Sequence, residues 1–258
     1  MEFTEPVLLK LESQRRSATA VAKRDHLMDL LQPISGERIL DIGCGGGAFC
    51  REVAPMVAPR GCVVGIDIAP AAVDIAKRLS TLEDWPVLTF TEADGHDLPF
   101  ADESFDAAVC ISVLGFCQDP RKALAEARRV LRSGGRFLVV NSDEDTRVYN
   151  GRDRELGRRI ARAIADRSND PWLGRRLAAM LTAAGFKLEQ ELVLVDLERE
   201  YAQETSGYAL AHFMRDYLLQ TASIPPEDYE RWLDDLAACA LEGSYVYSVV
   251  TYAYLATR

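Results

Sequence analysis

The sequence predicts an α/β protein built on a doubly wound, seven-stranded and mostly parallel sheet with helical lid segments. Three observations lead to this fold class. Strand and helix patterns alternate at short intervals, a glycine-rich turn joins the first buried strand to a helix, and an acidic residue follows each of the first three strands. Such alternation is typical of a parallel sheet that helices cover on both faces.

Apolar runs and helical periodicity place the individual elements. The predicted strands lie near residues 38–42, 62–67, 87–91, 106–111, 136–141, 188–197 and 245–255. The predicted crossing helices lie near residues 48–57, 70–80, 120–132 and 172–184. Asp119 and Pro120 supply an N-cap and a proline at the first helical position. Gly134 and Gly185 are expected to end the last two helices, because glycine adopts the left-handed conformation found there.

Three segments do not belong to this alternation, namely residues 1–33, 150–170 and 200–242. We expect one domain over 1–258, in which 1–33 is an N-terminal helical cover, 34–141 the cofactor-binding core and 142–258 the C-terminal half of the sheet. The two later segments would be helical lid insertions above the carboxyl ends of the strands, where ligands of open α/β sheets bind. The alternative is that these segments build the surface of a homodimer.

Composition and charge narrow the class of ligand. A formal net charge of −10 argues against a nucleic-acid substrate, since such binding depends on basic surface, and favours a small molecule. The N-terminus has no basic region followed by an apolar run, and no stretch reaches the roughly 18 apolar residues of a membrane span, so we expect a cytoplasmic protein. The six cysteines form no C-x-x-C pair, and no metal is expected.

The segment 39–48 is the most informative, because it has the pattern of a buried strand, a glycine turn and the start of a helix. Glycines let the main chain approach a nucleotide-like ligand closely, and the helix start offers free N–H groups. Gly43, Gly45 and Ala48 also fit the dinucleotide fingerprint, so the glycines alone leave a pyrophosphate ligand open. Asp41 favours another ligand, since its carboxylate would repel a pyrophosphate and attract an ammonium or sulfonium group.

Acidic residues after the next two strands point to the same kind of ligand. Asp67 ends the second strand, 20 residues after Gly47, where a carboxylate can accept hydrogen bonds from both ribose hydroxyls. Asp94 follows the third strand, where it can accept a hydrogen bond from an adenine amino group. Three acids therefore follow three successive strands around one ligand.

At these motifs the chain resembles the class I S-adenosylmethionine-dependent methyltransferases, and among them the subgroup around the ubiquinone and menaquinone methyltransferases (methyltransferase type 11). The resemblance is strong over about 24–141 and weak elsewhere. Ser133 stands where the family's R-V-L-x-P-G-G turn has proline. The motifs that carry the resemblance are residues 39–47, 64–67, 93–107 and 128–137.

The resemblance implies a Rossmann-like methyltransferase fold, with S-adenosylmethionine as cofactor and S-adenosylhomocysteine as product. Asp67 with Ile68 would hold the ribose. Asp94 with Gly95 and His96 would frame the adenine. The implied cofactor-binding residues, including the glycines beside the methionine portion, are Arg24, Asp41, Gly43, Cys44, Gly45, Gly47, Asp67, Ile68, Asp94, Gly95, His96, Ile111 and Ser112.

Three members of this set have less specific roles. Ser112 closes the fourth strand together with its neighbour Ile111 and should touch the ligand. Asp41 would order backbone donors of the loop or approach the ligand's amino group. Arg24 would pair with the ligand carboxylate, and its alternative role is that of an ordinary arginine in an exposed helix.

We expect transfer of a methyl group to O, N or C of a small-molecule acceptor, such as a secondary metabolite or a quinone-like compound, by in-line displacement. Alignment of the reactants and a dry pocket can supply most of the acceleration, so no general base is required. His212, Asp143 and Tyr149 are the candidates if the acceptor must lose a proton. Their alternative roles are structural: a core histidine, and a turn after the fifth strand.

Three other functions stay open. The chain could bind S-adenosylmethionine without transferring its methyl group, as a cyclase or a partner subunit. It could methylate a peptide or protein. A nicotinamide dehydrogenase shares the glycine turn, but Asp41 argues against it.

Overall fold

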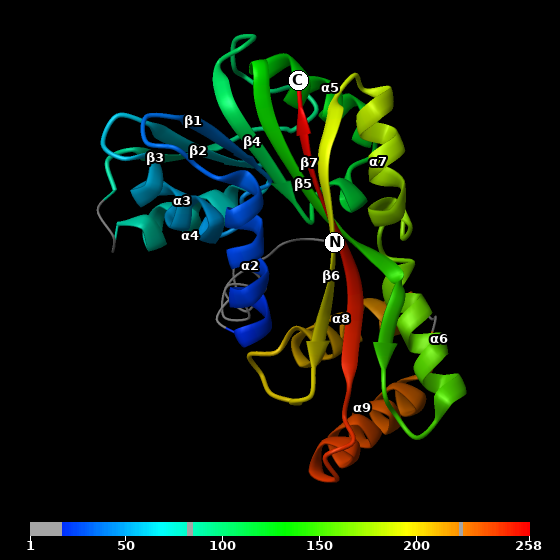
Figure 1. Ribbon diagram of the computed structural model, residues 1–258. Coiled ribbons are helices and arrows are strands. Elements are labelled where there is room, and N and C mark those ends of the chain that lie inside the picture. Colours follow the sequence, from blue (N-terminus) through cyan, green and yellow to red (C-terminus); the bar gives the residue numbers. More distant parts are fainter. Residues whose placement is uncertain (1–16, 82–84, 222–223) are drawn as a thin grey trace.

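A seven-stranded sheet in the order β3-β2-β1-β4-β5-β7-β6 organises the computed structural model, which describes residues 17–81, 85–221 and 224–258 (Figure 1). β7 is antiparallel to both of its neighbours, and the other strand pairs are parallel. The strands are β1 (Arg38–Ile42), β2 (Cys62–Asp67), β3 (Leu88–Glu92), β4 (Phe105–Ile111), β5 (Leu131–Tyr149), β6 (Lys187–Glu198) and β7 (Tyr247–Thr257).

Helices cover both faces of this sheet, as the alternating pattern predicts. The described helices are α2 (Ala18–Leu31), α3 (Ala48–Val57), α4 (Pro70–Ser80), α5 (Pro120–Val130), α6 (Arg154–Ala165), α7 (Leu173–Ala183), α8 (Ser206–Gln220) and α9 (Pro226–Leu241), with a short 3-10 turn η1 (Leu114–Phe116). The doubly wound fold class and its seven strands are therefore confirmed. Within the described ranges, no helix is long and apolar enough to cross a membrane.

The local helix signals are confirmed with one correction. The Asp119 side chain accepts hydrogen bonds from the backbone N–H groups of Arg121 and Lys122 and so caps α5. Gly185 follows the end of α7 with φ +87°. The prediction that Gly134 ends α5 is wrong, because the helix already stops at Val130 and Gly134 lies in an irregular turn within β5.

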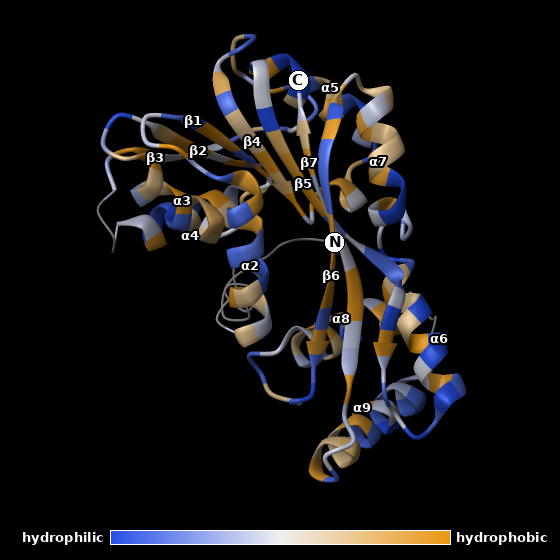
Figure 2. Cartoon of the chain, viewed as in Figure 1, coloured by the Kyte–Doolittle hydropathy of each residue, from blue (hydrophilic) through white to orange (hydrophobic). Residues whose placement is uncertain are grey.

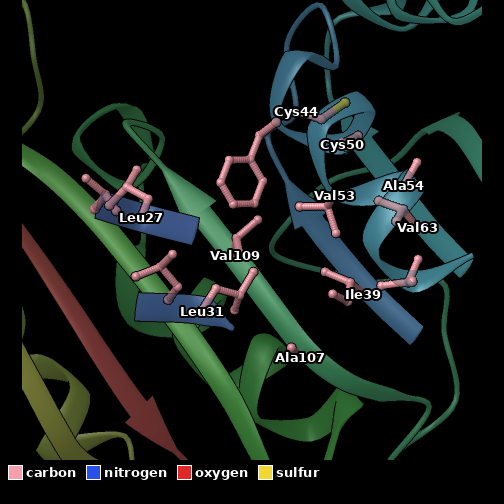
Figure 3. Close-up of a cluster of buried hydrophobic side chains, with 14 of the residues drawn as sticks. Leu27, Leu31, Ile39, Cys44, Cys50, Val53, Ala54, Val63, Ala107 and Val109 are labelled. Carbon is pink, nitrogen blue, oxygen red and sulfur yellow. The ribbon is translucent and has the colours of Figure 1, made fainter. Parts of the chain in front are cut away.

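Two hydrophobic clusters lie on opposite faces of the sheet. On one face, Leu27 and Leu31 of α2 and Val53 of α3 pack against Ile39 and Val109 of the sheet (Figure 3). On the other face, the apolar sides of α5 and α7 pack on β4 and β5. The strands between them are hydrophobic along much of their length (Figure 2). These clusters fix the carboxyl ends of β1 to β4, where the site lies.

A third cluster belongs to the predicted lid. It lies among α6, α8, α9 and the far ends of β5 and β7, with Tyr149, Trp232 and Tyr247 at its centre. The long strands β5, β6 and β7 extend beyond the rest of the sheet and carry these helices (Figure 1). In the predicted N-terminal cover the structure describes α2, while residues 1–16 lie outside the described residues.

The length of β5 corrects one prediction. The sequence analysis places Asp143 in a turn after the fifth strand, but the strand continues to Tyr149. Residue 143 pairs with Val250 and the next recorded pair is Val148 with Ser248, so a bulge lies between them. Thr146 stabilises the bulge, because its hydroxyl donates to the Asp143 carbonyl and accepts from the Val250 N–H group. The turn-forming residues after Asp143 therefore form a bulge within β5 and do not end the strand.

Candidate functional site

A cavity of about 730 Å³ opens at the carboxyl ends of β1 to β4. Every predicted cofactor-binding residue except Gly47 lines it, including Arg24 of α2, Ile68 after β2 and Ser112 after β4. The remaining wall combines residues of the core with residues of α2, of η1 and the segment after it, of the segment after α6, of β6 and of α8. The structure thus brings together, in one hollow, side chains that are spread over the first half of the sequence.

The glycine turn is held in a conformation that side chains disfavour. Gly43 has φ +74° and Gly45 has φ +54°, both in the left-handed region. The backbone N–H groups of Gly43 and Cys44 both donate to the Ile66 carbonyl at 2.8 Å, which ties the turn to β2. A Cβ atom on Gly43 would overlap Cγ2 of Val113 and lie 2.9 Å from its Cγ1. Glycine is therefore required by backbone angle and by space.

Gly47 has a different place from the one predicted. It does not line the cavity, and it serves as the N-cap of α3 with φ +74°. A Cβ atom there would lie 2.5 Å from Cζ of Phe90. Gly47 therefore lets α3 pack closely on the ring of Phe90, and it forms the junction between the glycine turn and α3.

The Asp67 carboxylate joins the glycine turn to the start of α4. Its Oδ2 accepts from the Gly45 N–H group and its Oδ1 from the Ala69 N–H group, each at 2.9 Å. A carboxylate oxygen has two lone pairs, so both oxygens can accept a further hydrogen bond from a ligand hydroxyl. The neighbouring Ile68 side chain is 67% exposed at the cavity and offers an apolar surface.

Asp94 and His96 form a second polar corner of the cavity. Oδ1 of Asp94 accepts from the His96 backbone N–H group at 2.9 Å and lies 2.7 Å from Nδ1 of its ring. The backbone hydrogen bond lowers the pKa of Asp94. Nε2 of His96 is buried and has no hydrogen-bond partner in the described part of the chain. A buried polar atom without a partner is costly, so this nitrogen fits a polar ligand group such as an adenine amine.

Asp41 adds a buried carboxylate to the lining of the cavity. Asp41 is 3% exposed, and its Oδ2 accepts a hydrogen bond from the Cys50 thiol with a sulfur–oxygen distance of 3.1 Å. Burial raises the pKa of Cys50, so the thiol keeps that proton. Arg24 of α2 also lines the cavity, and its Nε is 2.6 Å from the Glu52 carboxylate of α3.

Ser112 reveals a feature that composition and periodicity could not show. It has φ +60°, a conformation that costs a non-glycine residue about 1–3 kcal/mol. Its N–H group donates to the Val140 carbonyl at 2.8 Å, which holds the residue in place at the end of β4. Backbone strain of this kind concentrates at ligand sites.

Sequence reasoning missed the part of the wall that the lid contributes. Lys23 of α2 lines the cavity with its Nζ 2.8 Å from Asp196 of β6. Further missed residues come from η1 and the segment after it, from the segment after α6 and from α8. They are Phe116, Cys117, Gln118, Arg167, Ser206, Leu210 and Phe213. The sequence shows that Phe116, Leu210 and Phe213 are apolar, but the meeting of all these residues at one cavity depends on how the segments pack.

The three candidate bases do not line this cavity. Asp143 is 1% exposed and is paired with Arg175, whose Nη2 lies 2.7 Å from Oδ1. Tyr149 is buried, and its hydroxyl donates to the Gly207 carbonyl at 3.2 Å. Burial raises the pKa of Tyr149 well above its ordinary value.

His212 is the third candidate base, and it lies among aromatic rings of the lid. Its Nε2 is 3.1 Å from the Tyr201 hydroxyl, and its ring centre is 4.0 Å from that of Tyr208. Like Asp143 and Tyr149, it has structural contacts. The described residues contain no cluster of histidine, cysteine, aspartate and glutamate that could hold a metal ion.

Comparison with known proteins adds independent evidence. The model of a methyltransferase domain matches residues 40–139. An uncharacterized 37.1 kDa protein in transposon TN4556 of Streptomyces fradiae is 33% identical over 243 residues, which cover 93% of this chain and 68% of that protein. The O-methyltransferase cnsE of Penicillium expansum is 33% identical over 202 residues, which cover 76% of this chain and 70% of cnsE. The chain spans about half the length of two further curated relatives. It covers 52% of aklanonic acid methyltransferase DauC of Streptomyces sp. (strain C5) and 49% of a ubiquinone biosynthesis O-methyltransferase of Alkalilimnicola ehrlichii.

A solved structure agrees at the level of the fold. Phosphoethanolamine N-methyltransferase 2 of Haemonchus contortus, in complex with S-adenosylmethionine, superposes with a TM-score of 0.63 at 16% identity. The superposition covers 99% of this chain and 57% of that chain.

Proposed function

Because the chain belongs to the S-adenosylmethionine-dependent methyltransferases, we propose that it transfers the methyl group to a hydroxyl oxygen of a small, largely apolar acceptor. The observation that carries this proposal is the single cavity lined both by the glycine turn with its acids and by Leu210 and Phe213 of the lid. Transfer to nitrogen or carbon is the alternative. Oxygen is favoured because cnsE is named an O-methyltransferase, and a second relative is a ubiquinone biosynthesis O-methyltransferase.

Each part of the cavity has a role in this proposal. S-adenosylmethionine, when bound, supplies a methyl group on a positively charged sulfur. Asp67 would accept hydrogen bonds from the ribose hydroxyls, and His96 would accept one through the unpartnered Nε2. The Asp41 carboxylate favours a cationic ligand over an anionic one by Coulomb attraction. These groups fix the donor at the carboxyl ends of the strands.

The lid would position the acceptor and exclude water. Leu210 and Phe213 of α8 and Phe116 of η1 present apolar surface to the same cavity as the glycine turn. Alignment of two reactants in this way can lower the barrier by about 7–11 kcal/mol. Displacement from a sulfonium disperses charge, so a dry apolar wall assists it. Alignment would therefore supply the acceleration without a general base. The O–CH3 bond would form as the S–CH3 bond breaks, S-adenosylhomocysteine would leave as a neutral thioether, and the hydroxyl proton would be lost to bulk solvent.

The titratable groups of the cavity agree with this mechanism. Burial raises the pKa of Cys117 to about 11, so its thiol stays protonated at neutral pH. Lys23 is engaged by Asp196. The chemical roles predicted for Asp143, Tyr149 and His212 stay predictions, and the contacts of these residues lie outside the cavity.

The test is methyl transfer from S-adenosylmethionine carrying an isotopic label in its methyl group. The purified protein is incubated with matched acceptors that differ in the receiving atom, namely phenols, anilines and hydroquinones. We expect label in the phenol or hydroquinone product, together with one equivalent of S-adenosylhomocysteine. Tight binding of the donor without transfer to any acceptor would contradict the proposal and favour a binding protein or a cyclase. Transfer only to an added peptide would contradict the small-molecule class.

A further inference from the structure

Two arginines share one carboxylate where β5 lies beside the segment after α6, and one of them, Arg167, lines the cavity. Oε2 of Glu144 lies 2.6 Å from Nη2 of Arg147 and 3.7 Å from Nη2 of Arg167. The exposed fractions of the three side chains are 10%, 5% and 12%, respectively. Burial opposes the ionisation of Glu144, but the two arginines outweigh it and hold its pKa below the ordinary value. The Glu144 carboxylate is therefore ionised. Together with Arg147 and Arg167 it makes a group of three side chains with a net charge of +1.

Other charged residues nearby have partners of their own. Lys23 and Asp196 form a pair at 2.8 Å. Burial raises the pKa of Glu198, and its oxygens accept from the Ser206 and Gly207 N–H groups at 2.8 and 2.7 Å and cap α8. The Tyr247 hydroxyl accepts a hydrogen bond from Arg147, and burial raises the pKa of this phenol, so it stays neutral.

Arg167 is the arginine of this group that lines the cavity, whereas Arg147 does not. Nε of Arg167, like Nε of Arg147, is buried without a hydrogen-bond acceptor in the described part of the chain. Burial lowers the pKa of its guanidinium, although an arginine remains charged at neutral pH. A buried guanidinium with one long ion pair is poorly compensated, so a further anion would stabilise it.

The fold holds this guanidinium in place. Its centre lies 4.9 Å from the ring centre of Phe116, which also lines the cavity. Two residues later, Nδ2 of Asn169 donates to the Phe116 and Cys117 carbonyls, both at 3.0 Å. The Asn169 N–H group donates to the Gly115 carbonyl at 2.9 Å. The segment after α6 is thus tied to η1, and Arg167 is pre-oriented at the wall.

We propose that the acceptor is an apolar, ring-containing molecule that carries one carboxylate, and that Arg167 binds this carboxylate. This inference rests on the proposed function and names the substrate class of the same cavity. A planar guanidinium matches a carboxylate with two parallel hydrogen bonds. A carboxylate monoanion would match the net charge of +1 that Glu144, Arg147 and Arg167 carry together, whereas a phosphate dianion would add a second negative charge beside the Glu144 carboxylate. The rings of the acceptor would lie against Phe116, Leu210 and Phe213.

The test uses probes that share one ring system and differ in charge: 2-naphthoate, the neutral 2-naphthamide and 2-naphthyl phosphate. S-adenosylhomocysteine binding is measured first by calorimetry, and each probe is then titrated into the protein saturated with it. For the wild type we expect 2-naphthoate to bind at least about tenfold tighter than 2-naphthamide, as a charged hydrogen bond commonly provides. We expect 2-naphthyl phosphate to bind more weakly than 2-naphthoate.

Two variants assign the preference to one residue. In Arg167→Met the two affinities should come within about threefold of each other. Arg162→Met is the matched control, because the Arg162 side chain is 82% exposed and does not line the cavity. Its Nε is 3.8 Å from Oδ2 of Asp166. It should keep the wild-type preference. Arg167→Lys retains the charge without the planar fork and should show a reduced preference, which serves as the second variant if Arg167→Met does not fold.

The outcomes separate this inference from its premise. If S-adenosylhomocysteine does not bind the wild type, the proposed function fails and the inference falls with it. If it binds but 2-naphthoate has no advantage over 2-naphthamide, the inference alone is overturned. A preference that persists in Arg167→Met excludes Arg167 as its source. Tighter binding of 2-naphthyl phosphate than of 2-naphthoate excludes a site built for one carboxylate.

Discussion

Replacement of Gly43 by alanine tests whether the turn after β1 needs glycine for the two reasons that the structure shows. The left-handed backbone at φ +74° should cost an alanine about 1–2 kcal/mol. Overlap of the new methyl group with the Val113 side chain should add about 1–3 kcal/mol, as overpacking commonly does. We therefore expect the free energy of unfolding of Gly43→Ala to fall by about 2–5 kcal/mol.

Gly134→Ala is the matched control for the backbone contribution. Gly134 has φ +73°, but a Cβ atom there would have no neighbour within 4 Å. Its destabilisation should stay near the backbone cost of about 1–2 kcal/mol. The assay is urea unfolding of each variant without ligand. Equal destabilisation of the two variants would refute the steric argument at Gly43.

The double variant Gly43→Ala with Val113→Ala identifies the clashing group. The three atoms nearest to the built Cβ all belong to the Val113 side chain. The double variant should be more stable than the sum of the single effects predicts, by about 1 kcal/mol or more in a double-mutant cycle. Additive effects would show that the turn relaxes in another direction.

Two further predictions concern stability and the candidate bases. Glu126 accepts hydrogen bonds from Arg129 and from the Leu98 N–H group, and the Arg129 contact lowers its pKa. The Glu126 carboxylate therefore stabilises the folded protein fully at pH values above its pKa in the unfolded state, about 4.3. This stabilisation is lost as the pH falls through its lower pKa in the folded state. Glu126→Gln should lower the free energy of unfolding by about 1–2 kcal/mol at pH 7. In urea unfolding this difference from the wild type should shrink below about pH 4, and a difference that stays constant there would contradict the argument. Tyr149→Phe should lose about 1 kcal/mol of stability, because the hydrogen bond to the Gly207 carbonyl is removed. Its methyl-transfer rate should stay within a few fold of the wild-type rate. A hundredfold lower rate in a folded variant would instead indicate a chemical role for Tyr149.

The framework of the fold and the cofactor side of the cavity could be predicted because they follow from local patterns. Asp41 and Asp67 lie in the last two residues of β1 and β2, Asp94 lies two residues after β3, and the carboxyl ends of parallel strands meet at one edge of a sheet. Strand order in this fold class then brings the three acids to one cavity without further information. The glycine turn likewise depends only on its own backbone angles.

The acceptor side could not be predicted in this way. The residues around Asp143 have the composition of a turn, yet pairing with β7 draws them into β5 and buries the carboxylate against Arg175. Arg167 lies in a sequence segment rich in arginine, where a solvated helix face is the ordinary expectation. Only the packing of the lid distinguishes its side chain, 12% exposed, from that of Arg162, 82% exposed.

Calorimetric titration of S-adenosylhomocysteine into the wild type and into Asp67→Ala tests the central claim, that the cavity at the carboxyl ends of β1 to β4 is the donor site. We predict one binding site in the wild type and a loss of affinity of about 100-fold in Asp67→Ala, because two hydrogen bonds to a charged carboxylate are removed. Asp74→Ala, at an exposed position of α4, should bind like the wild type. Unchanged affinity in Asp67→Ala, or no binding by the wild type, would contradict the claim.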